Sequence, residues 1–545
     1  MNYSLDYPDI SVYEMLANSA SKYPSYTAVN YYGNKISYQD LVSETEKCAA
    51  ALKSAGCGQG DHVAVILPNL PQAVMLFYAC SRIGAICDMI HPLSAVNELK
   101  TYIESSDAKY IFAFEDVLSN LAFLADSNRK ICSVSASDYL PSLARIGFRL
   151  QSRHDKAAGS YEGFKTFISS GEKDLDILSG VAYTDQDEPC AMLYTGGTTG
   201  KNKGVLLTSR NFNYTAIEAI DSCACLLPGD KLLAVLPVFH GFGLGVGVHT
   251  VMAYGGTSVL LPIFKLKRFL KLIEKYKPEV IAGVPAIYGA MIANDMDVDM
   301  SFVKLVISGG DRLPPEMQRD FNALLRRHGS KAVIRQGYGL TECLSGVCLM
   351  PPGCTKENCL GLPYKDNDIM IVDPDTDESC EPGAKGEIII SGPSVMKGYF
   401  AESEETDAAL KVRSDGRIWL YTGDAGHKDE EGYVFFDARI KRMIVSNGYN
   451  IYPSVIEDLI CSVEGVRECA VAGVPDELRG EICKAFIVYD SVSEDANTEV
   501  LKQVKDKLSA NVSKFALPKA YITMESLPRT ALGKIDHETL ANKGR

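Results

Sequence analysis

The chain has 545 residues, of which 46% are hydrophobic and 23% charged, and this composition excludes a mainly disordered protein. Its net charge of −14, from 55 Lys and Arg against 69 Asp and Glu, disfavours a nucleic-acid-binding protein, because such proteins are usually basic. At about 150 residues per domain, the length allows roughly three to four structural units.

The first half of the chain alternates short apolar runs with amphipathic stretches. The apolar runs predict strands at 62–68, 108–114, 231–237, 257–262, 280–285 and 304–310. Residues 71–85 predict a helix. This alternation predicts an α/β fold in which helices cover a largely parallel sheet. The first residues, MNYSLDYPDI, and the last, ANKGR, show no targeting signal, so we expect a cytoplasmic protein.

Two segments allow a membrane interpretation. In residues 139–153, Arg145, Arg149 and Arg153 recur at four-residue spacing. This pattern is typical of a helix at an anionic membrane surface and also of a solvated surface helix, which we favour. The apolar stretch 241–264 contains His249 and several glycines, so it predicts a buried helix and strand rather than a membrane span.

The sixteen cysteines are expected to be reduced and mostly buried, since no export signal is present. One cluster has a spacing close to that of a metal site: Cys343, Cys348, Cys354 and Cys359. Paired zinc ligands are usually two to four residues apart, and each of these pairs has four residues between its members. Buried thiols without metal are the favoured interpretation.

The pattern of apolar and turn residues changes twice in the last third of the sequence. From about 361 to 437, short alternating strands separated by turn residues predict a β-rich subdomain. After Arg439, helices and strands alternate in a compact α+β unit. We therefore expect a large N-terminal domain of layered α/β subdomains over 1–438 and a small C-terminal domain over 439–545.

The strongest local motif is LYTGGTTGKNKGV at 193–205. Glycines let backbone N–H groups turn toward an anion, and hydroxyl groups add donors, so this loop predicts a phosphate site. The expected ligands are Thr195, Gly196, Gly197, Thr198, Thr199, Gly200 and Lys201. The Walker pattern does not fit, because Asn202 stands where a hydroxyl is required. A flexible surface loop is the alternative interpretation.

The loop resembles the phosphate-binding motif of the adenylate-forming superfamily, which comprises acyl-CoA synthetases, adenylation domains of peptide synthetases and beetle luciferases. Further segments that resemble motifs of this superfamily follow in order: SGGD (308–311), RQGYGLTE (335–342), GEIIISGP (386–393), MKGY (396–399), YTGD (421–424) and PRTALGK (528–534). An ordered series of motifs is far more specific than one loop. The resemblance covers most of the chain and leaves out about 115–175.

The resemblance implies a site for ATP and Mg²⁺. The residues expected there are Gly309, Gly310, Asp311, Gln336, Gly337, Tyr338, Thr341, Glu342, Asp424 and Arg439. Tyr338 is expected to stack on adenine, and Thr341 to contact the α-phosphate. Glu342 is the expected Mg²⁺ ligand, since hard carboxylate oxygens suit this ion. Asp424 and Arg439 are expected to hold the ribose.

The resemblance also implies a reaction in two steps. A carboxylate attacks the α-phosphorus of ATP and gives acyl-AMP and pyrophosphate; a thiol then displaces AMP. Lys534 is the expected catalytic cation between carboxylate and α-phosphate, and His240 is expected near the substrate carbonyl. Gly448 is expected beside the channel for CoA. Lys441 is the expected hinge about which the C-terminal domain rotates.

The acid is expected to be a medium- or long-chain fatty acid. Between 236 and 250 there is no Asp to hold an α-ammonium group, and four glycines among apolar residues predict room for an aliphatic chain. The variant YTGGTTG also resembles that of bacterial fatty acyl-CoA ligases. Other interpretations stay open: an aryl acid–CoA ligase, an adenylation enzyme that loads a carrier protein, an inactive sensor, and a luciferase-like oxidation. Val445 stands where some relatives carry a second Lys, which weakens the expectation for the thiol step.

Overall fold

The computed structural model describes residues 3–142, 145, 161–181, 185–195, 203–294, 298–440, 444–446, 449–451, 453–476, 480–491, 493–512, 516–529 and 535–544. The chain forms two compact units. The first comprises Met1–Gly197, Lys201–Asp368 and Ser391–Leu420, and the second Thr198–Gly200, Ile369–Ile390 and Tyr421–Arg545. The boundary predicted at 438/439 marks an expected hinge and stays a prediction.

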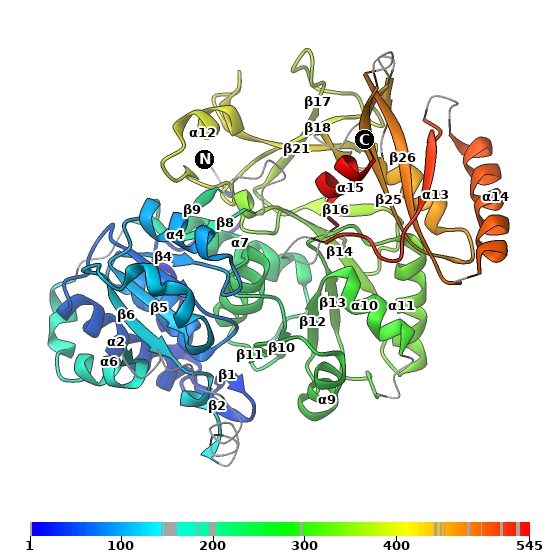
Figure 1. Ribbon diagram of the computed structural model, residues 1–545. Coiled ribbons are helices and arrows are strands. Elements are labelled where there is room, and N and C mark those ends of the chain that lie inside the picture. Colours follow the sequence, from blue (N-terminus) through cyan, green and yellow to red (C-terminus); the bar gives the residue numbers. More distant parts are fainter. Residues whose placement is uncertain are drawn as a thin grey trace. The chain divides into compact units, whose positions relative to one another are not determined.

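One sheet of the first unit has eight strands in the order β19-β9-β8-β4-β3-β5-β6-β7 (Figure 1). Their bounds are β3 (His62–Ile66), β4 (Ile86–Met89), β5 (Tyr110–Phe114), β6 (Lys130–Val134), β7 (Glu162–Gly163), β8 (Pro189–Tyr194), β9 (Gly204–Thr208) and β19 (Gly398–Tyr399). The strands from β8 to β7 pair in parallel, whereas β9 returns antiparallel to β8. The predicted phosphate loop therefore connects the antiparallel pair β8 and β9.

A second sheet contributes to the first unit a run of strands in the order β16-β15-β14-β13-β12-β10-β11-β1-β2. Its strands are β1 (Thr27–Tyr31), β2 (Asn34–Ser37), β10 (Lys231–Ala234), β11 (Thr257–Leu260), β12 (Val280–Gly283), β13 (Leu305–Ser308), β14 (Ile334–Tyr338), β15 (Cys348–Leu349) and β16 (Cys359–Pro363). The stretch from β1 to β14 is parallel. The α/β class and the six predicted strands are confirmed. Each strand ends at the predicted residue or up to three residues before it.

Helices flank both sheets of the first unit (Figure 1). They are α1 (Val12–Lys22), α2 (Tyr38–Ser54), α3 (Pro71–Arg82), α4 (Val96–Ser105), α6 (Phe164–Gly171), α7 (Ser209–Cys223), α9 (Leu266–Tyr276), α10 (Pro285–Ala293), α11 (Pro315–Arg327) and α12 (Ser403–Ala409). The helix predicted at 71–85 is confirmed as α3. It begins at a proline, whose fixed φ suits the first helical position, and all of it except Arg82 is buried. Because α3 is buried on all sides, it is a helix of the core.

The second unit contains two further groups of hydrogen-bonded strands. One has the order β17-β18-β21-β22, from β17 (Asp368–Val372), β18 (Gly386–Ser391), β21 (Ile418–Lys428) and β22 (Val434–Arg439). The start of β21 belongs to the first unit, where it pairs with β20 (Leu410–Val412). The other is built from β23 (Ile444–Ser446), β24 (Tyr449–Ile451), β25 (Val466–Asp476), β26 (Gly480–Tyr489) and β27 (Ala520–Thr523). It packs with α13 (Pro453–Cys461), α14 (Glu494–Asn511) and α15 (His537–Lys543) around buried side chains such as Ile460, Ile487 and Leu540. The predicted α+β character is confirmed.

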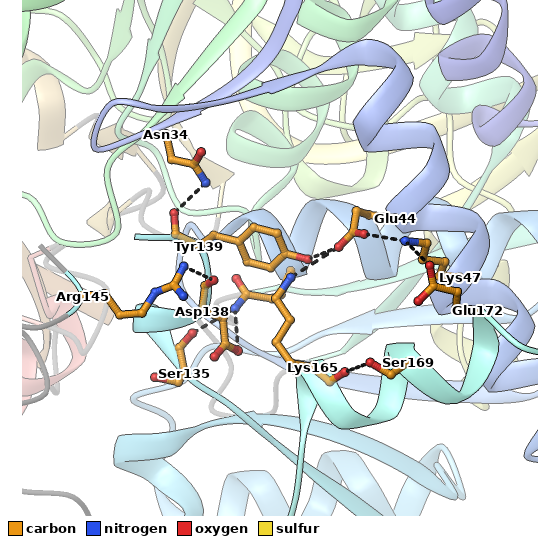
Figure 2. A network of polar contacts seen from close by, with 11 residues as sticks. Asn34, Glu44, Lys47, Ser135, Asp138, Tyr139, Arg145, Lys165, Ser169 and Glu172 are labelled. Atoms are coloured by element: carbon orange, nitrogen blue, oxygen red, sulfur yellow. Dashed lines mark hydrogen bonds and ion pairs between the residues drawn. The ribbon is translucent and has the colours of Figure 1, made fainter. Parts of the chain in front are cut away.

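The carboxylate of Glu44 on α2 holds together the two ends of the polar segment that follows β6 (Figure 2). It accepts hydrogen bonds from the Tyr139 hydroxyl at 2.7 Å, from Lys165 at 3.4 Å and from Lys47 at 3.2 Å. The Lys165 ammonium group also lies 3.6 Å from the centre of the Tyr139 ring. Burial raises the pKa of Glu44, but the Tyr139 hydroxyl and the lysine charges outweigh it, so the pKa is lowered overall.

The basic segment predicted at 139–153 falls largely on residues 143, 144 and 146–160, which lie outside the described residues. Arg145 is described, and its guanidinium donates to the Asp138 and Leu140 carbonyl oxygens, at 3.3 and 3.2 Å. In the part of the chain that the structure describes, no helix is long and apolar enough to cross a membrane. The membrane-surface interpretation of 139–153 stays a prediction.

The apolar stretch predicted as helix and strand is confirmed as η5 (Phe242–Thr250, a π-helix), α8 (Val251–Ala253) and β11. His249 on η5 is fully buried. Its Nε2 lies 2.9 Å from Asn213 Oδ1 and its Nδ1 lies 3.1 Å from the Tyr78 hydroxyl. One acceptor and one donor satisfy a neutral imidazole. Burial accordingly lowers the pKa of His249 to about 3.

We expect His249 to make the free energy of unfolding fall by up to about 1.4 kcal/mol per pH unit as the pH drops below about 6.5. The folded protein keeps His249 neutral down to pH of about 3, whereas the unfolded chain takes up a proton near the ordinary pKa of 6.5. Stability from this group is therefore complete above pH 6.5 and is lost on acidification. Urea unfolding between about pH 4.5 and 8 checks this. His249→Gln should be less stable at pH 8 and show a flatter decline; parallel curves would contradict the expectation.

Candidate active site

The predicted phosphate loop has a hydrogen-bonded neck. The Thr195 N–H donates to the Lys203 carbonyl at 3.0 Å, and the Lys203 N–H donates to Thr195 Oγ1 at 3.2 Å. Thr195 therefore closes the end of β8 against the start of β9. The loop residues Gly196, Gly197, Thr198, Thr199, Gly200 and Lys201 lie outside the described residues, as do Lys441, Gly448 and Lys534.

The predicted adenine residues meet at one edge of the second sheet. Strands β13 and β14 are parallel, and Ser308 is in register with Gln336, so the segments that follow both strands leave the sheet together. This places Gly309, Gly310 and Asp311 beside Gly337 and Tyr338. Gly310 has φ of +77°, a left-handed conformation that favours glycine. Thr341 and Glu342 follow in the short helix η6 (Thr341–Cys343).

The carboxylate of Glu342 has a dedicated donor. The Tyr399 hydroxyl donates to Glu342 Oε1 at 2.8 Å, and the Met396 N–H donates to the Glu342 carbonyl at 2.8 Å. The Lys203 ammonium group lies 4.6 Å from the centre of the Tyr399 ring and pairs with Glu405. Burial, followed by the charge of Glu342, raises the pKa of Tyr399. Glu342 is thus held in place by a neutral phenol near a cation.

The sequence motif MKGY at 396–399 shows that Tyr399 belongs to the resemblance, but it does not indicate which group the hydroxyl contacts. The link to Glu342 depends on β19 pairing with β9 in the first sheet. Glu405, the ion-pair partner of Lys203, lies on α12 and has no motif of its own. The contacts of these two residues could not be predicted from the sequence.

The predicted ribose residues lie together in the second unit. Asp424 on β21 is directly opposite Arg439 on β22, and Arg439 Nε lies 3.0 Å from Asp424 Oδ1. The Asp424 side chain is 1% exposed, whereas that of Arg439 is 44% exposed. The Asp424 N–H donates to Thr422 Oγ1 at 3.0 Å, and the Thr422 hydroxyl donates to the Ile388 carbonyl at 2.6 Å. A carboxylate offers about four acceptor positions, so the ion pair does not exhaust it.

His240 lies just before η5. Its carbonyl accepts the Leu244 N–H at 2.9 Å, and its ring is 5.0 Å from Phe239 and 6.5 Å from His91, measured between ring centres. His91 Nδ1 accepts the Leu93 N–H at 2.8 Å, and burial lowers the pKa of His91. His91 therefore favours the neutral form. Sequence reasoning did not single it out, because a lone His after a strand carries no motif.

An apolar cavity begins at the predicted adenine residues. Gly309, Gly337 and Tyr338 line one part of it, and side chains of η5, α7 and the strands line the rest. Its empty volume is about 580 Å³ including the part open to solvent, and the space open to the centre of a water-sized probe is about 40 Å³. Among the described residues that line it there is no Asp, Glu, Lys, Arg or His. The cavity therefore suits an uncharged apolar group.

The glycines of η5 do not themselves line this cavity, and the room that they were expected to leave for an aliphatic chain stays a prediction. None of Gly241, Gly243, Gly245 and Gly247 lines the cavity. A Cβ at Gly243 would lie 1.9 Å from the Pro237 carbonyl oxygen, and one at Gly241 would lie 2.4 Å from Ser345 Oγ. Gly241 and Gly243 let η5 pack closely against its neighbours, whereas Phe242 and Val246 line the cavity.

The cysteine cluster gives no metal site within the described residues. No group of three or more His, Cys, Asp or Glu side chains in the described part of the chain could hold a metal ion. Cys343, Cys348 and Cys359 are buried, and Cys354 is partly exposed. Burial raises the pKa of Cys343 well above its ordinary value, so this thiol favours its neutral form.

Two family models match the chain, one over its large N-terminal part and one over its C-terminal part. The family described as AMP-binding enzyme matches residues 16–400, and the AMP-binding enzyme C-terminal domain matches residues 455–534. The first match alone covers well over half of the chain. The protein belongs to the AMP-binding enzyme family.

Similar proteins include two CoA ligases. The chain is 34% identical over 550 residues to a long-chain-fatty-acid–CoA ligase of Bacillus subtilis (strain 168), covering 98% of this chain and 94% of that protein. It is 30% identical over 527 residues to an indoleacetate–CoA ligase of Aromatoleum aromaticum, covering 96% of each. Among solved structures, ATP-bound MatB from Rhodopseudomonas palustris has a TM-score of 0.82 at 26% identity, covering 98% of this chain and 99% of that one.

Proposed function

We propose that the protein converts a medium- or long-chain fatty acid, ATP and CoA into acyl-CoA, AMP and pyrophosphate. As a member of its family, with CoA ligases as its relatives, it is an AMP-forming acid–thiol ligase. The observation that carries the choice of acid is the uncharged cavity that starts beside Gly309, Gly337 and Tyr338. The similarity to a long-chain-fatty-acid–CoA ligase supports the same choice.

The proposed reaction has two steps, and each forms one bond and breaks another. The acid's carboxylate oxygen forms a bond to the α-phosphorus of ATP, and the bond to pyrophosphate breaks. The CoA thiol then forms a bond to the acyl carbon, the bond to AMP breaks, and the thiol proton is released. Lys534 is the proposed cation between the carboxylate and the α-phosphate. The proposed hinge at Lys441 and the proposed CoA-side residue Gly448 belong to the second step.

We propose Glu342 as the ligand of Mg²⁺. Carboxylate oxygens are the ligands that Mg²⁺ prefers, and the Tyr399 hydroxyl fixes one oxygen of Glu342 at 2.8 Å. When bound, Mg²⁺ would offset negative charge on the phosphates of ATP. Tyr399 would orient the carboxylate, and Lys203 would add positive charge nearby. Thr195, at the neck of the loop, would set where the phosphate loop leaves the sheet.

Tyr399→Phe is expected to raise the Mg²⁺ concentration for half-maximal activity by roughly 10–100-fold, because groups that orient a metal ligand typically change metal affinity by that factor. ATP–pyrophosphate exchange titrated with Mg²⁺ measures this change. The matched control is Tyr13→Phe, which removes another tyrosine–carboxylate hydrogen bond, to Glu46 at 2.9 Å. Equal Mg²⁺ requirements in the two variants would contradict the orienting role of Tyr399.

An aryl acid is the second candidate substrate, since an indoleacetate–CoA ligase is also similar to the chain. ATP–pyrophosphate exchange with fatty, aryl and amino acids tests the proposal. Exchange that depends on fatty acids supports it, and exchange only with aryl or amino acids refutes it. A second assay compares free CoA with a phosphopantetheinylated carrier protein as thiol acceptor. Thioester formed only on the carrier would instead identify an adenylation enzyme that loads a carrier.

A further inference from the structure

The cavity follows one face of the helix η5 and its continuation α8. Four of its lining residues, Phe242, Val246, Thr250 and Tyr254, are spaced four residues apart. In the wider turns of the π-helix η5, and in α8, side chains about four residues apart lie close to the same face. The four side chains therefore mark successive depths of the cavity, with Phe242 at one end and Tyr254 at the other.

The strands show which end is deep. Gly309, against which the Phe242 ring packs, follows the carboxyl end of β13 and belongs to the candidate nucleotide site. Leu232, Val280 and Leu305, which also line the cavity, lie at the amino ends of their strands. The cavity thus runs along the parallel strands, from the predicted adenine residues to the opposite edge of the sheet.

Tyr254 occupies the deep end and is held from behind. Its side chain is 8% exposed. A Cβ placed on Gly256 would lie 2.3 Å from a carbon of the Tyr254 ring and 2.6 Å from its hydroxyl, so the ring packs directly on the glycine backbone. Among the described residues, the buried Tyr254 hydroxyl has no hydrogen-bond partner. Replacing Tyr254 by phenylalanine would therefore remove no hydrogen bond to a described residue.

We propose that the Tyr254 ring closes the acyl cavity and so limits the length of the fatty acid that the protein activates. This inference rests on the proposed function. Twelve residues separate Phe242 from Tyr254, which corresponds to at most about 18 Å of helix. An extended chain advances about 3.3–3.6 Å for every three bonds, so roughly 15 bonds fit along this path. The limit lies at a chain of about 12–16 carbons.

Chain-length profiles of three variants test the role of Tyr254, with kcat/KM measured for saturated acids of increasing length. Tyr254→Ala is expected to move the optimum to acids longer by about three to five carbons, because it removes the floor. Tyr254→Leu, a milder change, should move it less and in the same direction. Tyr254→Phe should leave the optimum unchanged, since it keeps the ring.

A variant at a shallower depth tests the opposite direction. Thr250 lies one helical turn nearer to the nucleotide end, so Thr250→Phe is expected to shorten the longest accepted acid by about four or five carbons. The matched control is Tyr23→Ala, because the Tyr23 ring packs against the neighbouring Gly255 and does not line the cavity. Its optimum should equal that of the unmodified protein.

The role of Tyr254 and the activation of fatty acids are refuted by different results. If the unmodified protein activates fatty acids but Tyr254→Ala and Tyr254→Leu keep its optimum, the role of Tyr254 is refuted and the function stands. If Tyr254→Phe shifts the chain-length optimum as much as Tyr254→Ala does, the role of the ring is refuted, and the hydroxyl sets the limit. If the unmodified protein activates no fatty acid, the proposed function itself is refuted.

Discussion

Replacing Lys534 by alanine is expected to lower ATP–pyrophosphate exchange by roughly 10²–10³-fold, the usual effect of removing one group that stabilises developing charge in a transition state. The carboxylate and ATP are both anionic, so the first step needs a cation between them. The second step needs no such cation, because acyl-AMP already carries the acyl group. Thioester formation from supplied acyl-AMP and CoA should therefore remain close to normal.

The comparison of the two half-reactions is what makes this test specific. Lys543→Ala provides the matched control, since Lys543 is an exposed lysine on α15, the helix that follows Lys534 in the sequence. It should leave both half-reactions unchanged. Equal loss of both half-reactions in Lys534→Ala would show a general defect of the C-terminal domain and would contradict the proposed catalytic role.

The second large effect is expected at Asp424. Asp424→Ala should raise the KM for ATP by roughly 10–100-fold, because hydrogen bonds to a charged group contribute about 1.5–3 kcal/mol. The ribose does not react, so its contacts hold substrate and transition state alike, and kcat should change little. Steady-state kinetics with ATP as the varied substrate measure both parameters.

The position of Asp424 sharpens this expectation. It is almost fully buried beside Arg439, and its N–H is fixed by Thr422, so its carboxylate is held in one orientation. Asp375→Ala is the control, since it removes an exposed carboxylate in the turn after β17. An unchanged KM for ATP in Asp424→Ala, with the unfolding midpoint preserved, would rule out the ribose contact.

The general plan of the molecule could be predicted from the sequence. Parallel strands are buried on both faces, so β3, β5, β10, β11, β12 and β13 appear as continuous apolar runs that need no tertiary information to locate. The family could be predicted for a similar reason: phosphate, adenine and ribose each require particular residue types at close spacing, and such motifs are local. Asp424 and Arg439 were both expected at the ribose, and the strands β21 and β22 bring them face to face.

Other contacts depended on the tertiary structure. Tyr399 and Glu342 are 57 residues apart, and their hydrogen bond exists because β19 joins the edge of the sheet beside β9. The glycines of η5 illustrate the same limit. Their spacing shows that small residues alternate with apolar ones, but only the packing decides that Gly243 and Gly241 face Pro237 and Ser345 while Phe242 and Val246 line the cavity.

The sequence by itself determined that this protein is an acidic α/β protein of the AMP-binding enzyme family, because strand periodicity and motif spacing are properties of short segments. Only the tertiary structure decided which side chains orient Glu342, where the apolar cavity runs and that Tyr254 stands at its deep end. The physical reason is that a cavity wall is assembled from α7, η5 and several strands, and the direction of each side chain is fixed by packing between elements rather than by its neighbours in the sequence.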